Sequence, residues 1–351
     1  MGLERGGFSR PPLIASGSGA RLVLLGTAGG SVYYPDQWRR GMASAVVVGD
    51  AVYLIDCGEG AATRFRQAEL GPSGFRHGFD NLRAIFFTHL HSDHTVGYPG
   101  ILVAGLFNGV TNVAKPVQVF GPGQGVLTDP PISERAPSRV VNPQNPMPGT
   151  VDLTRGIFAA YARDLNERLR SPTALNPETL FDPHDIVLPA GADADPSGQP
   201  SPEMDPFAIY EDENVRVTAT LVDHRPCFPA FGFRFDMSDG SIAFSGDTRP
   251  TDNVVRLSRN TQILVHEVVC RPALDRALTE PALRARLDAI VGYHTTVEEV
   301  DRVASVVRPR VLVLSPVMPP NVAEHEFRAA APTFTGEVVV GQDLDQITVR
   351  G

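Results

Sequence analysis

Three histidines and an aspartate are closely spaced in residues 88–94, THLHSDH, directly after the apolar run IFF. Imidazole nitrogens and carboxylate oxygens form the ligand set that Zn, Fe and Mn prefer. Alternate residues at a strand end point the same way, so His89 and His91 can hold one ion. Asp93 and His94 lie further on, where the chain turns into a helix, and can face a second ion. The pattern predicts a metal site, against the alternative of a His-rich surface loop.

The motif His-x-His-x-Asp-His after a strand resembles the hallmark of the metallo-β-lactamase superfamily, and further similar segments extend over most of the chain. The segment DCGEG (56–60) resembles the acidic glycine turn of that fold. The segment DHRPCFPAFGFRF (223–235) resembles the one that supplies a third histidine, and FSGDT (244–248) resembles the one that supplies a bridging aspartate. Two segments, LVHEVV (264–269) and YHTT (293–296), resemble segments of the ribonuclease Z branch. Two further segments, LLGTAGG (24–30) and RRGMASAVVV (39–48), resemble relatives described as arylsulfatases.

The resemblance implies an α/β fold, a four-layer αββα sandwich of two mixed β-sheets. It also implies that His224 joins His89 and His91 at a first metal ion, and that Asp247 bridges two ions. Asp93 then either binds the second ion or orients the attacking hydroxide. Taken alone, His224 could be a core histidine bonded to a backbone carbonyl, and Asp247 could cap a helix. The implied cofactor is Zn²⁺, with Mn and Fe as alternatives.

The implied reaction is hydrolysis by a metal-bound hydroxide, because a metal lowers the pKa of bound water to about 7. His294, with Glu267, would protonate the leaving group. A purely structural His–Glu pair is the alternative. The predicted catalytic residues are Asp93, His294 and Glu267, and the predicted metal ligands are His89, His91, Asp93, His94, His224 and Asp247.

One expected ligand is replaced. Relatives typically place a histidine after a late strand in a pattern such as Leu-Ser-His, whereas this chain has Leu314-Ser315-Pro316. Proline cannot coordinate a metal, so the second site would keep Asp93, His94 and Asp247 only. We therefore expect one firmly bound Zn²⁺ and a weakly held second ion, unless His325 or His294 substitutes.

Alternating apolar strands and helices must position these residues. Strands are expected at 21–26, 44–49, 52–57, 82–89 and 115–122, and helices at 58–70 and 151–170. The second half has strands at 215–224, 230–236, 241–247, 262–269 and 311–316, with helices at 253–259, 281–290 and 297–307. Strands in pairs or threes with helices between them favour two mixed sheets with helices outside. We expect a loose leader at 1–20 and one domain at 21–351, with a helical and loop insertion at about 121–215.

Composition limits the partners. The 351 residues carry 31 Lys and Arg against 40 Asp and Glu, a net charge of −9, which disfavours nucleic acid as a partner. No apolar run reaches the length of a membrane span, and no signal peptide is recognisable. Three widely spaced cysteines (Cys57, Cys227 and Cys270) predict no disulfide framework and favour the cytoplasm.

The leading functional hypothesis is a hydrolase of a small ester: a phosphodiester, sulfate ester, carboxylic ester or lactone. The alternative is a ribonuclease Z-like endonuclease that processes the 3′ end of tRNA. Ribonuclease Z enzymes usually carry a long arm between the third-histidine and bridging-aspartate segments, whereas a short SDG turn joins them here. A further alternative is a non-catalytic metal-binding protein with a degenerate second site. The expected partners are a small ester substrate and, in a homodimer, a second copy of the chain.

Overall fold

Runs of β-branched and aromatic residues form the strands of two sheets in the computed structural model, which describes residues 10–14, 19–73, 78–127, 139–277, 280–328 and 331–350. The first sheet has the order β14 (Gln346–Thr348), β1 (Arg21–Gly26), β2 (Ala43–Val48), β3 (Ala51–Ile55), β4 (Leu82–Phe86), β5 (Val117–Pro122), β6 (Phe181–Ile186). The second has the order β13 (Glu337–Val340), β12 (Val311–Met318), β11 (Ile263–Val269), β10 (Gly240–Phe244), β9 (Phe231–Met237), β8 (Arg216–Leu221), β7 (Phe207–Glu211). Each sheet mixes parallel and antiparallel pairs.

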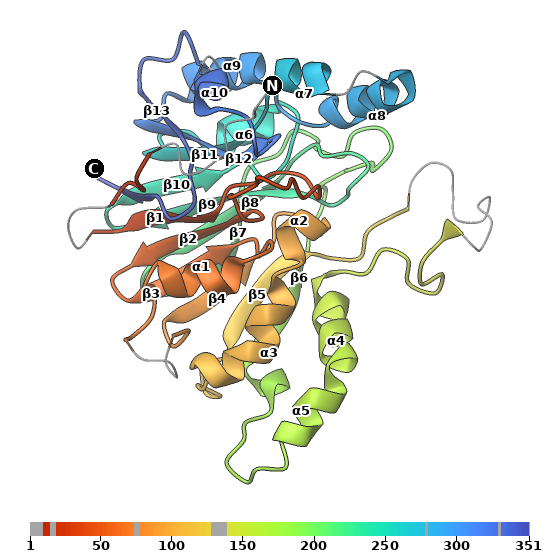
Figure 1. The fold of residues 1–351 in the computed structure, drawn as a ribbon, viewed down its shortest axis with the longest axis vertical. Coiled ribbons are helices and arrows are strands. Elements are labelled where there is room, and N and C mark those ends of the chain that lie inside the picture. The colour runs from red at the N-terminus through yellow and green to blue at the C-terminus, as the bar shows by residue number, and fades with distance from the viewer. Residues whose placement is uncertain are drawn as a thin grey trace.

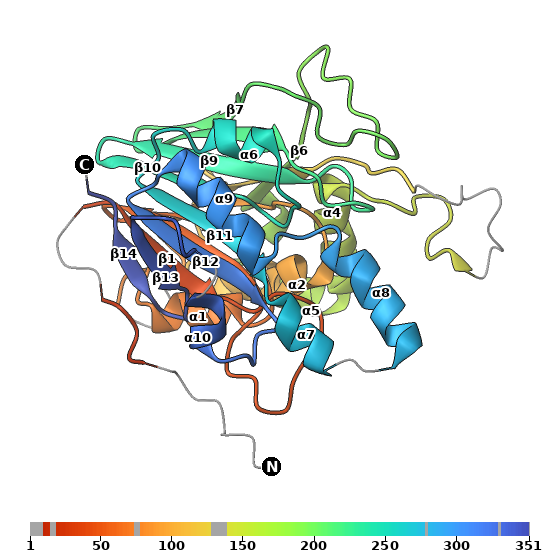
Figure 2. The ribbon, with the colours of Figure 1, turned by 90° about the horizontal axis from the view of Figure 1, so that it is seen from above.

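The helices cover the outer faces of both sheets (Figure 1). The first sheet carries α1 (Ala61–Gln67), α3 (Tyr98–Asn108), α4 (Thr150–Ala160), α5 (Ala162–Arg168) and the 3₁₀ turn η3 (Pro177–Thr179), with α2 (Ser92–Thr95) preceding α3. On the side of the second sheet lie α6 (Asp252–Leu257), α7 (Arg271–Ala277), α8 (Pro281–Val291), α9 (Val297–Val307) and α10 (Glu324–Arg328). Seen from above, α9 lies over the second sheet, against β11 (Figure 2). The predicted αββα sandwich of two mixed sheets is confirmed.

The two sheets bury an aromatic core between them. Phe86 of β4 is fully buried, and its ring lies 5.2 Å from that of Phe235 and 5.8 Å from that of Phe233 on the opposing sheet. It also stacks on Phe120 of β5 at 5.6 Å. These contacts lock the sheets together and thereby fix the edge at which both sets of parallel strands end.

We expect Phe86→Ala to lower the free energy of unfolding by about 3–5 kcal/mol, because it leaves a cavity between the sheets. Urea denaturation measures the change. Phe107→Ala removes the same atoms from a side chain that is 44% exposed and is the matched control. Equal losses in the two variants would contradict the role given to the core.

Several elements differ from the sequence-based expectation. The helix expected over 151–170 breaks at Tyr161 into α4 and α5. The segment 121–215, expected to be helical and loop-like, also contains β6 and β7, which are the edge strands of the two sheets. Of the leader, residues 1–9 and 15–18 lie outside the described part, while Arg10 pairs with Asp345 at 2.7 Å. The domain boundaries stay a prediction. No described helix is long and apolar enough to cross a membrane.

Parallel strands bring the candidate residues to one edge. The strands β3, β4 and β5 are parallel neighbours in the first sheet, as are β10, β11 and β12 in the second. Their carboxyl ends therefore lie together, which is where α/β folds place ligands. The motif of residues 88–94 follows β4, and Asp247 follows β10, so both are delivered to this edge.

Candidate metal centre

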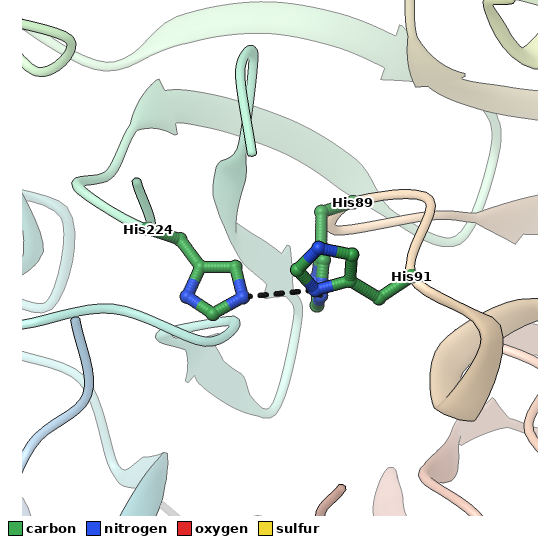
Figure 3. A group of neighbouring side chains, drawn as sticks. All are labelled: His89, His91 and His224. Atoms are coloured by element: carbon green, nitrogen blue, oxygen red, sulfur yellow. Dashed lines mark hydrogen bonds between the residues drawn. The ribbon is translucent and has the colours of Figure 1, made fainter. Parts of the chain in front are cut away.

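Three histidines converge from two segments of the chain, with His91 and His224 133 residues apart (Figure 3). Nε2 of His89 lies 3.0 Å from Nδ1 of His91, and Nε2 of His224 lies 3.1 Å from the same Nδ1. His89 and His224 are buried, while His91 is the most accessible of the three. One ring nitrogen cannot satisfy two others by hydrogen bonding unless protons are placed on both partners. A cation between the three nitrogens satisfies them together.

A second group lies beside the first. His94, from α2, turns its Nε2 to within 3.4 Å of Oδ2 of Asp247 and 3.6 Å of Oδ2 of Asp93. Asp93 is held by the backbone N–H of Gly30 at 2.8 Å. Oδ2 of Asp247 is also 4.0 Å from Nε2 of His224. The Asp247 carboxylate therefore stands between the two groups.

The buried atoms of these residues fit a divalent cation. Within the described residues, Nε2 of His94 and Oδ1 of Asp247 are buried and have no hydrogen-bond partner. Leaving such groups unpaired costs about 1–3 kcal/mol each, more when charged. Burial opposes ionisation of Asp247, but His94 and the other histidines outweigh it and hold the pKa of Asp247 well below its usual range. A carboxylate surrounded by imidazoles is the donor set that Zn²⁺ binds.

Asp56 supports the histidines from outside. Its carboxylate accepts hydrogen bonds from Nδ1 of His94 at 2.8 Å and from the Oγ1 and N–H of Thr88, also at 2.8 Å. Thr88 Oγ1 in turn lies 3.1 Å from Nδ1 of His89. Asp56 thus orients ligands for both groups. The segment DCGEG was recognised in the sequence, but the role of its aspartate depends on contacts that only the fold provides.

We expect Asp56→Asn to weaken metal binding by roughly 10–100-fold, the usual cost of losing a group that orients a ligand. Competition with a chromogenic chelator measures the affinity. Asp212→Asn is the control, since Asp212 also accepts bonds from two hydroxyls, those of Tyr53 and Tyr210. Unchanged affinity in Asp56→Asn would remove Asp56 from the metal centre.

The pair His294 and Glu267 meets the cluster at Asp247. Nδ1 of His294 lies 2.8 Å from Oε2 of Glu267 and 3.9 Å from Oδ2 of Asp247. Burial raises the pKa of Glu267 to about 7, against the lowering effect of His294. Burial lowers the pKa of His294, but Glu267 outweighs it and raises that pKa to about 9. With Nδ1 directed at Glu267, the other ring nitrogen is left for a ligand. His224, Asp247 and His294 form a third group that could hold an ion.

The expected loss of an imidazole from the second site stays a prediction, and the structure places His294, one of the two possible substitutes, beside Asp247. Pro316 does occupy a position on β12, and its neighbour Val317 accepts a hydrogen bond from the N–H of Gly29 at 3.0 Å. His294, cast as a proton donor, is the imidazole that the fold brings to Asp247. His325 is exposed on α10 and belongs to none of the described ligand groups.

His266 lies on β11 and was left out of the predicted site. Its Nδ1 lies 2.8 Å from the backbone oxygen of Glu267, and its buried Nε2 has no partner among the described residues. Burial lowers the pKa of His266 to about 4, with Asp247 opposing. The signal in the sequence was the His–Glu pair of LVHEVV, which does not reveal which of the two residues faces the cluster.

No protein-family model matches the chain. Ribonuclease Z of Mycobacterium sp. (strain KMS) is 29% identical over 332 residues, which cover 94% of this chain and 96% of that protein. Ribonuclease Z of Mycobacterium marinum is 28% identical over 332 residues, covering 94% and 98%. The crystal structure of human tRNase Z, short form, has a TM-score of 0.59 at 22% identity, covering 94% and 99%.

A further solved structure, the metallo-β-lactamase fold protein YhfI from Bacillus subtilis, has a TM-score of 0.55 at 13% identity and covers 93% of this chain and 98% of its own. The two structural likenesses identify the fold, and the sequence relatives show similarity to ribonuclease Z. The likeness to arylsulfatase relatives stays a prediction. The chain therefore has the metallo-β-lactamase fold, is similar to ribonuclease Z over nearly its whole length, and is a hydrolase that acts on ester bonds.

Proposed function

We propose that this protein is a metal-dependent RNA phosphodiesterase that cleaves precursor tRNA at its 3′ side. The observation that carries the proposal is the similarity to ribonuclease Z, which spans 94% of this chain and 96% of that relative. This replaces a generic small ester as the leading candidate substrate. The clustered histidines and aspartates support it, because phosphodiester hydrolysis needs charge stabilisation at two oxygens of the phosphoryl group.

In this proposal, His89, His91 and His224 hold one ion, and Asp93, His94 and His294 hold the other. Asp247 is shared between the two. When bound, the ions would polarise the phosphoryl oxygens and neutralise the charge that develops on them. Zn²⁺ suits the histidine-rich donor set best, with Mn and Fe as alternatives.

The chain's own groups position protons around these ligands. Glu267 accepts the Nδ1 proton of His294 and so keeps the other ring nitrogen directed away from it. In this assignment His294 would serve as a ligand in place of the proton donor expected from the sequence, because an imidazole nitrogen that binds an ion carries no proton. Asp93, anchored by Gly30 and by Ser31 Oγ at 3.2 Å, keeps a carboxylate oxygen at the cluster that can orient a water molecule and accept its proton.

A small phosphodiester is the second candidate substrate, and one specific observation favours it. Strands β9 and β10 are joined through Ser238 and Asp239 alone, so no arm extends between His224 and Asp247. A chain of net charge −9 also has few cations to spare for a long RNA.

Incubation of the Zn²⁺-loaded protein with a precursor tRNA at physiological salt tests the proposal. We expect one cut at the 3′ side of the tRNA body and its loss on chelation of the metal. Bis(p-nitrophenyl) phosphate serves as the small substrate in a parallel assay. Hydrolysis of this compound without any cleavage of the tRNA would favour the small-ester hypothesis, and inactivity towards both would favour a metal-binding protein without catalysis.

A further inference from the structure

A pocket of about 510 Å³ opens beside His294, which forms part of its lining. Its walls come from three segments that follow the metal-centre residues in sequence. Arg249 and Pro250 come after β10, Arg271 starts α7, and Arg302 lies on α9. Since His294 lines the pocket and also reaches Asp247, a ligand bound there lies next to the metal centre.

The charge of the pocket is opposite to that of the chain. Its lining includes three arginines and two carboxylates, Asp288 and Glu299, in a protein of net charge −9. A cationic pocket in an acidic chain attracts anions. Which arginines can act on a ligand depends on how firmly each is already bound to protein carboxylates.

Arg249 has only a loose partner. Its Nη1 is 3.8 Å from Oδ2 of Asp223, which is too long for a hydrogen bond. The carboxylate of Asp223 is already bound by Arg225, whose Nε and Nη2 donate to its two oxygens at 3.0 and 2.9 Å. The guanidinium of Arg249, with its side chain 47% exposed, therefore keeps donors for an incoming anion.

Arg302 also has only a loose ion-pair partner. Its Nη2 is 3.8 Å from Oε1 of Glu299, and its side chain is 76% exposed. The other carboxylate oxygen of Glu299 accepts bonds from the N–H and Oγ1 of Thr296, both at 3.0 Å, in the capping box of α9. Glu299 is thus committed to the start of the helix, and Arg302 retains most of its hydrogen-bonding capacity.

Arg271 differs from the other two. It donates to Asp275 at 2.9 Å and also to Asp288 on α8. These bonds tie α7 to α8 and use both ends of the guanidinium. Arg271 therefore builds the wall of the pocket, and the ligand-binding role falls to Arg249 and Arg302.

We propose that this pocket binds a backbone phosphate of the RNA strand next to the scissile phosphate, through Arg249 and Arg302. The assignment rests on the proposed function. Guanidinium groups bind phosphate oxygens by paired N–H donors, which fixes the strand as well as attracting it. The positive charges of Arg249 and Arg302 would compensate, beside the point of cleavage, for the acidic character of the rest of the chain.

The variants Arg249→Ala and Arg302→Glu test the assignment in the Zn²⁺-loaded protein. The probe is a fluorescein-labelled pentaribonucleotide, and anisotropy titrations at several salt concentrations give its Kd. We expect the Kd to rise roughly tenfold in each variant. Losing one phosphate contact should also reduce the slope of log K against log salt by about 0.7, the value for single strands. In precursor tRNA cleavage, KM should rise more than kcat falls.

Arg163→Glu is the matched control, because Arg163 is a 93% exposed arginine with a helical Glu167 partner on the distant α5. Its Kd for the oligonucleotide should equal that of the wild type. Metal content and a thermal melt confirm that each variant is folded.

The outcomes separate this inference from the proposed function. Failure of the wild type to cleave precursor tRNA counts against the proposed function, whereas the ratio of oligonucleotide Kd values judges the pocket. Variants that bind the oligonucleotide as the wild type does overturn the inference, and so does a wild type that does not bind it. Inorganic phosphate is the remaining probe. If it binds the wild type tightly and the oligonucleotide does not, the pocket serves a small phosphate and the assignment to RNA is wrong.

Discussion

Replacing Asp247 by asparagine is expected to abolish hydrolysis and to lower the content of both metal ions. Its carboxylate lies 3.4 Å from Nε2 of His94, 4.0 Å from that of His224 and 3.9 Å from Nδ1 of His294. An amide of the same shape preserves the packing but removes the charge that the imidazoles and the ions share. If metal catalysis supplies about 4 kcal/mol of transition-state stabilisation, the rate falls about a thousandfold.

Metal analysis after dialysis and the rate on bis(p-nitrophenyl) phosphate measure the two effects. Asp301→Asn is the control, since Asp301 is also a buried carboxylate but accepts its bonds from Thr333 and Phe334 on the outer face. Asp301→Asn should lose stability and keep its metal. Two tightly bound ions in Asp247→Asn would show that the carboxylate is not shared between them.

The strands that the sequence predicts well are those buried on both faces. For example, RLVLLG and AVYLI form β1 and β3, because apolar runs of this kind must be covered on both faces. The sequence does not predict the strands β6, FDPHDI, and β7, FAIYE, because neither is a long apolar run. Each pairs on one side only, at the edge of its sheet, and tolerates a proline or polar side chains that a central strand excludes.

The residues of the candidate site also differ in how far the sequence predicts them. Residues 88–94 hold four candidate ligands within a few positions, so local spacing alone identifies them. His224 and Asp247 needed the resemblance, since nothing local distinguishes them from a core histidine or a helix cap. The resemblance pointed to His294 as a proton donor or a substitute ligand, but the sequence does not decide between the two roles. His294 is 200 residues from His94, and only the packing of α8 and α9 against the strand edge brings it to Asp247.

That placement leads to the second large effect. We expect His294→Ala to reduce the tightly bound metal from two ions to one and the rate by at least about 100-fold, because the second ion loses an imidazole ligand. Zinc titration and metal analysis after gel filtration give the stoichiometry. Glu267→Gln keeps the imidazole and changes only the group that orients it, so it should weaken the second ion without removing it.

Pro316→His distinguishes the two possible sources of the missing imidazole. If the second site really lacks a ligand at Pro316, the new histidine tightens the second ion in an otherwise native protein. If His294 is the ligand, Pro316→His leaves the stoichiometry unchanged and only disturbs the contact of β12 with Gly29. At that contact the Cβ of Pro316 lies 3.4 Å from the position that a Cβ on Gly29 would take. Two tight ions in His294→Ala, or a second ion that tightens in Pro316→His, would restore Pro316 as the defect. If only His294→Ala loosens the second ion, His294 is the seventh ligand, on a segment 200 residues from His94 that reaches the histidines only through the fold.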